Sequence, residues 1–226
     1  MHRFLLVTLT ALYFLYNNSV SAQNFAVGRQ EVGVSYGYWT SEQVLISLEQ
    51  PYHTNMIDYT NSSLDFLKAE KIFGVPWNQP VTLTGRNRSG AIFATYLFKP
   101  IEQLGAGIGM GFQTESGNFI TTYPGSTSPL KVGTYKRTIV TLAPELRLSY
   151  AYNDWFHLYG LLGLGRSFYR ETVTRDSDGV TETINGGYWM FQVSPLGIKV
   201  GKKIAGFIEG GFGYKGLARG GVAINF

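Results

Sequence analysis

The chain contains no cysteine among its 226 residues. This excludes a disulfide-stabilised fold and also a lipoprotein anchor, which is attached to a cysteine at the end of the leader. After residue 22 there is no run of about 18 apolar residues, so a helical membrane span is not expected. The formal net charge is only +4, which gives no basic field for nucleic acid. Mean hydropathy is −0.02, but this average says little about a chain in which polar and apolar residues alternate.

Residues 1–22 have the pattern of a cleavable secretory signal peptide. Arg3 supplies the positive charge, 4–16 is the apolar stretch, and small residues precede Gln23. A retained membrane anchor is the alternative, but the apolar stretch is short for a span. We therefore predict export, and a mature chain of one domain, 23–226.

A two-residue alternation of large apolar and small or polar residues dominates the rest of the chain. It is clearest at 104–113, where leucine, alanine, isoleucine, methionine and phenylalanine alternate with four glycines and a glutamine. Such strands have one oily and one polar face. Proline inside a strand predicts a bulge or break, here at Pro144 and Pro195. The eight predicted strands are 31–38, 91–98, 104–113, 138–150, 155–169, 188–200, 204–214 and 219–226.

The connections between these strands alternate in length. Short joins lie at 99–103, 151–154 and 201–203, whereas the long connections are 40–89, 114–137 and 171–187. Short turns at one end and long loops at the other, with aromatic residues near strand ends, are typical of transmembrane barrels. The fold class predicted is all-β, an eight-stranded antiparallel up-and-down transmembrane β-barrel. A secreted lipocalin is the rival, but there the apolar face lines the cavity.

The last strand ends in a pattern of its own. Gly221, Ile224 and Phe226 place a glycine before alternating apolar residues and a terminal aromatic. With the leader and the strands, this resembles the small outer-membrane β-barrels of Gram-negative bacteria, the OmpA-like superfamily, although an aromatic is commoner where Ile224 stands. The resemblance implies that these residues are a signal read by the barrel assembly machinery. It also implies the cell outer membrane as location, with outer-membrane lipid and lipopolysaccharide as partners and no nucleic acid.

The inward face carries charges that could form a polar network in the lumen. The residues predicted for it are Glu145, Arg147, His157, Lys199, Glu209 and Arg219, with Glu31 near a strand end. Opposite charges in a narrow bore can pair and fill it. The alternative is that they gate a narrow channel for small or apolar solutes.

An enzyme is the third hypothesis, because some outer-membrane barrels hydrolyse lipid A. Such chemistry needs a base beside a serine or a positioned water. His157 has no serine beside it, and His53 lies in the first long loop. We therefore predict no enzyme, no cofactor and no metal, but a structural or surface-interaction role. The apolar 40–89 loop as a partner site, and membership in a larger assembly, stay open.

Overall fold

Antiparallel β-strands make up most of the chain that the structure describes. The computed structural model describes residues 30–40, 81–101, 103–122 and 128–226. The predicted signal peptide and most of the predicted first loop lie outside these residues. The strands are β1 (Gln30–Tyr38), β2 (Val81–Arg88), β3 (Ala91–Ile101), β4 (Leu104–Thr121), β5 (Leu130–Tyr152), β6 (Phe156–Arg175), β7 (Thr181–Gly201), β8 (Ile204–Gly213) and β9 (Ala218–Asn225). No helix of the described residues is long and apolar enough to cross a membrane.

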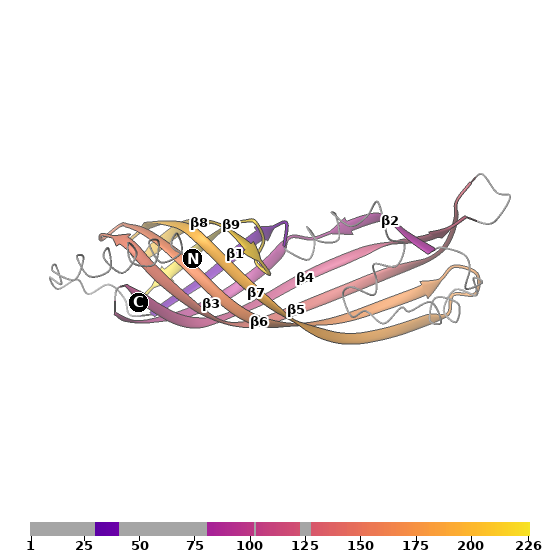
Figure 1. Ribbon diagram of the computed structural model, residues 1–226, viewed down its shortest axis with the longest axis horizontal. Coiled ribbons are helices and arrows are strands. Elements are labelled where there is room, and N and C mark those ends of the chain that lie inside the picture. Colours follow the sequence, from indigo (N-terminus) through magenta and orange to yellow (C-terminus); the bar gives the residue numbers. More distant parts are fainter. Residues whose placement is uncertain (1–29, 41–80, 102, 123–127) are drawn as a thin grey trace, which may run out of the picture.

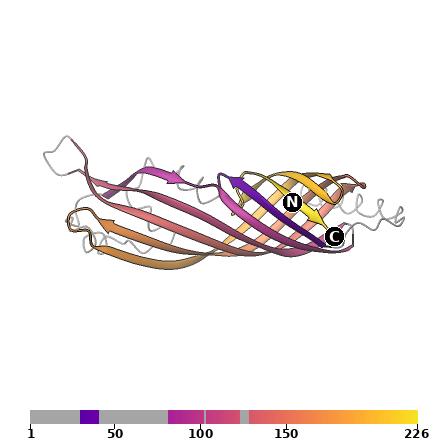
Figure 2. The ribbon, with the colours of Figure 1, turned by 180° about the vertical axis from the view of Figure 1, so that it is seen from behind.

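The sheet closes on itself. Its order is β2-β4-β3-β1-β9-β8-β7-β6-β5, and an additional pairing of β4 with β5 joins the two sides into a ring. Figure 2 shows β1 in indigo beside the yellow β9, where the first and last strands of the ring meet. The predicted all-β antiparallel ring is therefore confirmed. In the described chain β2 is a ninth strand, which pairs only with the outer end of β4 and occupies residues predicted as loop.

Large apolar side chains cover the outside of the ring. On β1, Val32, Val34, Tyr36 and Tyr38 are exposed, whereas the residues between them and Glu31 before them, all on the other face, are buried. The period of two places successive side chains on opposite faces, so one strand serves both surfaces. The same outward band includes Ile108, Met110 and Phe112 of β4, Leu142, Leu146 and Leu148 of β5, Leu162, Leu164 and Phe168 of β6, and Val200, Leu196 and Phe191 of β7.

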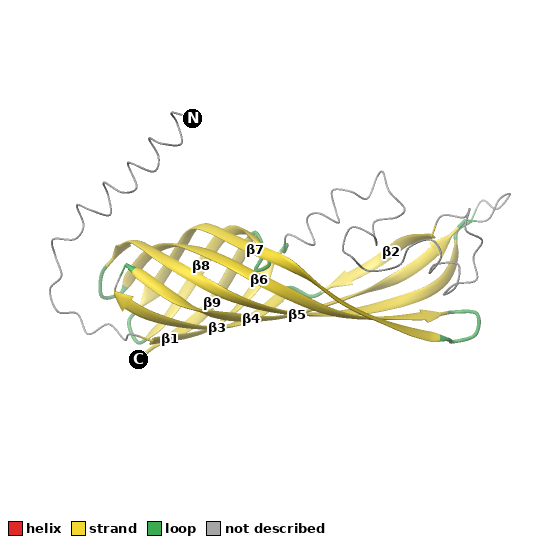
Figure 3. Ribbon diagram, turned by 60° about the horizontal axis from the view of Figure 1, so that its bottom comes forward, coloured by secondary structure: helices red, strands yellow, loops and turns green. Residues whose placement is uncertain are grey.

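Strands β4 to β7 continue well beyond the ring, while β1, β8 and β9 stop (Figures 1 and 3). The predicted long connections at 114–137 and 171–187 are wrong, because strands occupy most of both. The sidedness of the strands inverts along these extensions. Their inner face carries a cluster of apolar residues beside the buried Glu115, Arg137 and Glu171, and their outer face carries threonine, asparagine, lysine and arginine. The inner cluster consists of Phe119, Val132, Tyr135, Ile139, Tyr169, Val173 and Ile184, with Tyr188 packed against it.

The two prolines predicted to interrupt strands behave differently. At Pro195 the register against both neighbouring strands shifts by one residue, which is the predicted break. At Pro144 the register of β5 is the same on both sides, so of the two predicted alternatives, a bulge or a break, the structure shows a local break in the pairing with β6. Next to this proline, Ala143 and Pro144 lack partners on β6, whereas Pro144 still aligns with Ile108 of β4. Proline lacks the N–H that a full ladder requires, so one side of the ladder is interrupted without adding a residue.

Candidate functional site

The interior of the ring holds three layers of ion pairs, the first near the short-turn end. Glu31 is the second residue of β1 and is 2% exposed. Its carboxylate accepts from Arg147 at 2.6 Å and from Lys199 at 2.7 Å, and Lys99 lies 3.0 Å away. Lys199 also donates to the side-chain oxygen of Asn225 at 3.1 Å, which ties β7 to β9. One carboxylate therefore holds cations from three other strands.

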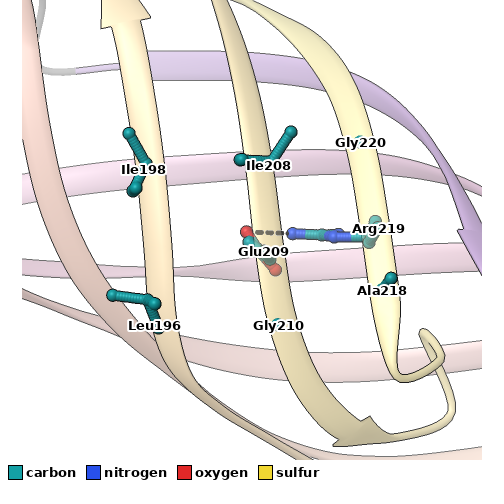
Figure 4. A pocket seen from close by; sticks show the side chains of 8 residues that line it. All are labelled: Leu196, Ile198, Ile208, Glu209, Gly210, Ala218, Arg219 and Gly220. Carbon is teal, nitrogen blue, oxygen red and sulfur yellow. Dashed lines mark hydrogen bonds and ion pairs between the residues drawn. The ribbon is translucent and has the colours of Figure 1, made fainter.

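The second layer lies further along β8 and β9. Glu209 and Arg219 face each other across these neighbouring strands and form a buried ion pair, shown as a dashed line in Figure 4. The hydroxyl of Tyr159 donates to the same Glu209 oxygen at 2.7 Å. The guanidinium carbon of Arg147 lies 4.4 Å from the centre of the Tyr159 ring. Through Arg147 and Tyr159 the first two layers form one continuous network.

The third layer is supplied by the turn between β8 and β9, which points into the ring. Lys215 is 1% exposed, and its ammonium lies 2.5 Å from the Glu145 carboxylate. Tyr214 donates to the other oxygen of that carboxylate at 3.0 Å. Gly213 and Gly216, with φ of 144° and 105°, flank this pair in backbone conformations that favour glycine. The turn thereby closes the interior from the side opposite the short turns.

The structure places five of the six predicted network residues in these layers. Glu145, Arg147, Lys199, Glu209 and Arg219 are all buried and paired. His157 is only half buried and stacks on the ring of Tyr152 at 6.3 Å, and its side chain makes no hydrogen bond or ion pair with another described residue. It does not belong to the network.

Sequence reasoning missed Tyr214 and Lys215. Tyr214 is the last residue of the predicted strand 204–214, where the alternation places it on the outward face with Ile208, and Lys215 lies in a segment that looks like a short exposed turn. The available signal was the Gly-Tyr-Lys-Gly spacing, in which two glycines bracket a bulky pair. Glycines that accept positive φ allow a tight turn to point its two central side chains inward.

Bulky side chains fill the space over the inward glycines. A Cβ built at Gly109 would overlap the Glu145 carboxylate, one at Gly163 the Tyr214 ring, and one at Gly197 the Tyr159 ring. These glycines lie where the network side chains need room, which is a close-approach use of glycine in strands. The interior is therefore a packed polar core.

Two further ion pairs lie on the inner face of the extension, outside the ring layers. Arg137 donates to Glu171 at 2.6 Å and lies 5.4 Å from the ring centre of Tyr169. Glu115 accepts from Arg88 at 3.0 Å and from the Tyr135 hydroxyl at 2.9 Å. Burial, with the adjacent Glu115 carboxylate, raises the pKa of Tyr135, so the phenol stays protonated and donates.

The outward face of β8 and β9 carries a shallow apolar groove. Gly210, Ala218 and Gly220 form its floor, and Leu196, Ile198 and Ile208 line it (Figure 4). Its volume is about 430 Å³. A Cβ at Gly210 would meet nothing within 4 Å, unlike the inward glycines, so the groove is open to the surroundings of the ring.

Of the C-terminal residues predicted as an assembly signal, Gly221 and Ile224 lie on β9 beside β1, and Phe226 directly follows the end of β9. Ile224 and Phe226 are exposed on the outward face, and the backbone of Phe226 exchanges two hydrogen bonds of 3.0 Å with Gln30. A Cβ at Gly221 would press on Ser35 and the Phe207 ring, so a small residue is required there for packing. A role as an assembly signal stays a prediction.

No protein-family model matches the chain, and no curated protein is similar to it in sequence. Among solved structures, the chain is similar to the crystal structure of Ail, the attachment invasion locus protein of Yersinia pestis. The identity is 14% and the TM-score 0.30, over 88% of this chain and 94% of Ail. A likeness this distant carries no argument for what the chain does, and membership in the OmpA-like superfamily stays a prediction.

Proposed function

We propose that the chain is an integral outer-membrane β-barrel of a Gram-negative envelope, closed to solutes, that acts through the part of its sheet raised above the membrane. The observation that carries this is the sidedness of the ring. Its outside is a band of exposed leucine, isoleucine, valine and aromatic side chains, and its inside holds ion pairs. Contiguous exposed apolar surface of this extent has to be covered, and a bilayer covers a ring from all sides.

The same sidedness argues against a lipocalin-like carrier. A soluble barrel places its apolar face in the cavity and its charges in water. Here Glu31, Lys199 and Lys215 are each no more than 2% exposed, while Met110 and Leu164 are among the most exposed apolar residues. Burying charges is unfavourable unless they are paired, and all three of these charges are paired inside the ring.

A structural or surface-interaction role fits the extension of β4 to β7. Beyond the apolar band, the outer faces of these strands are polar. On β5 the change takes place between two successive outward residues, Val140 and Thr138. This is the boundary expected where strands leave hydrocarbon for water. We propose that this raised sheet presents the surface through which the protein acts. We assign no catalytic role, because the side chain of His157, the one histidine among the described residues, forms no hydrogen bond with a serine of the described chain.

The membrane barrel is tested by heat-dependent gel mobility. Protein extracted in a mild detergent is expected to run differently when unboiled and boiled, because a closed ladder of strand pairs resists dodecyl sulfate until heated. A water-soluble protein of the same size serves as control. Identical mobility of the two samples would contradict the proposal.

The packed interior predicts that the barrel does not conduct. In planar bilayers the refolded protein is expected to give no discrete current steps at 1 M salt, because three layers of paired side chains occupy the bore. An open porin inserted in parallel shows that insertion can be detected. Reproducible steps from the purified protein would instead support the alternative, a narrow channel gated by these charges.

A further inference from the structure

Three cations project from the outer face of β5 and β6, where the apolar band ends. Lys136, Arg166 and Arg170 are all exposed, and their positions alternate with those of the inward residues Arg137, Ser167 and Glu171. Across the strand pair, Arg170 aligns with Thr138, and Lys136 aligns with Thr172. The three cations therefore lie on one continuous surface.

Arg166 starts inside the apolar band and is held at its edge by aromatic rings. It aligns with Leu142 on one side and Trp189 on the other. Its guanidinium carbon lies 5.4 Å from the ring centre of Phe168 and 5.8 Å from that of Trp189. An arginine that begins in an apolar band and directs its charge to the boundary is a snorkelling side chain.

Glycine makes room for this arrangement. A Cβ added at Gly187, the neighbour of Phe168 on β7, would lie 3.6 Å from the Arg166 Nε and 2.9 Å from a backbone oxygen. The stem of Arg166 thus passes over a position with no side chain. The guanidinium is in this way directed toward the level of Arg170.

Among the residues that the structure describes, no acidic side chain on this face neutralises the three charges. The outward residues around them on β4, β5 and β7 include Ser116, Thr138 and Asn185, all of them uncharged. The neighbouring Glu171 faces inward and is paired with Arg137. In the described part of the chain, Lys136, Arg166 and Arg170 form no ion pair, whereas the exposed Lys131 pairs with Asp176 at 3.2 Å.

We propose that Lys136, Arg166 and Arg170 form a binding site for the phosphate groups of lipid A in the outer leaflet. This deepens the proposed function and rests on it, since the ring has to span the membrane with its extension outside. The fit is one of charge and of position. Guanidinium groups bind phosphate with two parallel hydrogen bonds, and the apolar surface of Phe168, Trp189 and Val140 lies directly below, where acyl chains would begin. The three cations lie at different positions along the β5–β6 pair. This separation suits a lipid with two phosphates better than one with a single phosphate.

The test is a titration of the refolded full chain with lipid A in an uncharged detergent containing EDTA, with bound lipid counted by native mass spectrometry. The variant Lys136→Gln/Arg166→Gln/Arg170→Gln is expected to bind at least about tenfold more weakly, since each boundary cation contributes on the order of 1 kcal/mol. Lipid A stripped of both phosphates is expected to bind the wild type no more tightly than intact lipid A binds the triple variant. Phosphatidylglycerol is expected to bind several-fold more weakly than lipid A.

A matched control is available at the opposite end of the barrel. Lys202 and Lys203 are exposed cations of the β7–β8 turn, and Lys202→Gln/Lys203→Gln should bind lipid A as the wild type does. Equal binding by wild type and triple variant would overturn the site, and equal affinity for phosphatidylglycerol would overturn the assignment to lipid A. Heat-dependent gel mobility is measured on every preparation. Its absence from the wild type would refute the barrel itself, so the two failures are distinguishable.

Discussion

Glu31→Gln is expected to destabilise the folded barrel by about 3–5 kcal/mol, because it removes one carboxylate and leaves several buried cations unpaired. Arg147, Lys199 and Lys99 all lie within 3.0 Å of the Glu31 carboxylate, which is buried with its partners. Glutamine has nearly the same volume as glutamate and still accepts hydrogen bonds. The loss of unfolding free energy therefore measures the effect of removing the negative charge. The measurement is the free energy of unfolding from reversible urea titrations of the protein in lipid vesicles.

A double-mutant cycle separates the pair from the packing. Adding Lys199→Met to Glu31→Gln should cost less than the sum of the two single changes, since the double variant leaves fewer unpaired charges. Glu182→Gln is the matched control, because Glu182 is half buried on β7 and makes no ion pair with a described residue. It should change the unfolding free energy by less than about 0.5 kcal/mol. Additive single effects at Glu31 and Lys199, or a Glu31 effect no larger than the control, would contradict the network.

The ring itself could be predicted from the sequence because its signal is simple. A period of two with bulky apolar residues on one side determines which face of each strand points outward, and register follows from that choice. On β4, Ile108, Met110 and Phe112 alternate with glycines, and the structure turns the large residues outward. The same rule predicts Glu145, Arg147 and Glu209 on the inward face, where the structure has them.

The extension could not be predicted by the same rule, because its pattern is inverted. Along β5, the outward positions change from Val140 to Thr138, and the inward positions change from Thr141 to Ile139 and Tyr135. The rule for the ring requires large apolar residues at the outward positions. Because the outward positions of this segment are polar, the rule predicts a loop there. In the proposed membrane barrel, the surroundings of one strand change along its length from hydrocarbon to water, and this change reverses which alternation stabilises the strand.

Part of the interior network could not be predicted from the alternation along the strands either. Phase assigns a face to residues within strands, but Tyr214 and Lys215 lie in a turn, where no alternation applies. Glu31 and Lys199 lie near strand ends, where exposure to water would be the expected outcome. Both are nevertheless buried, because the side chains converge on the axis from β1, β5 and β7. Only the curvature of a closed ring brings such distant residues together.

Leu146→Arg is expected to lower the unfolding free energy in vesicles by about 2–4 kcal/mol, since an outward charge near the middle of the apolar band has to enter hydrocarbon. Leu146 is 49% exposed and aligns with Ala106 and Leu162, so the substitution neither opens a core cavity nor breaks an ion pair. On a soluble barrel the same exposed position would accept arginine within about 0.5 kcal/mol. Thr138→Arg, eight residues along the same face of β5 and beyond the apolar band, is the matched control and should cost less than about 1 kcal/mol, because charges near the interface are cheap. Measured by urea titration of both variants in the same vesicles, a large cost at Leu146 with a small one at Thr138 locates the hydrocarbon against the outside of the ring. Equal and small costs at the two positions would mean that water, and not lipid, surrounds this band.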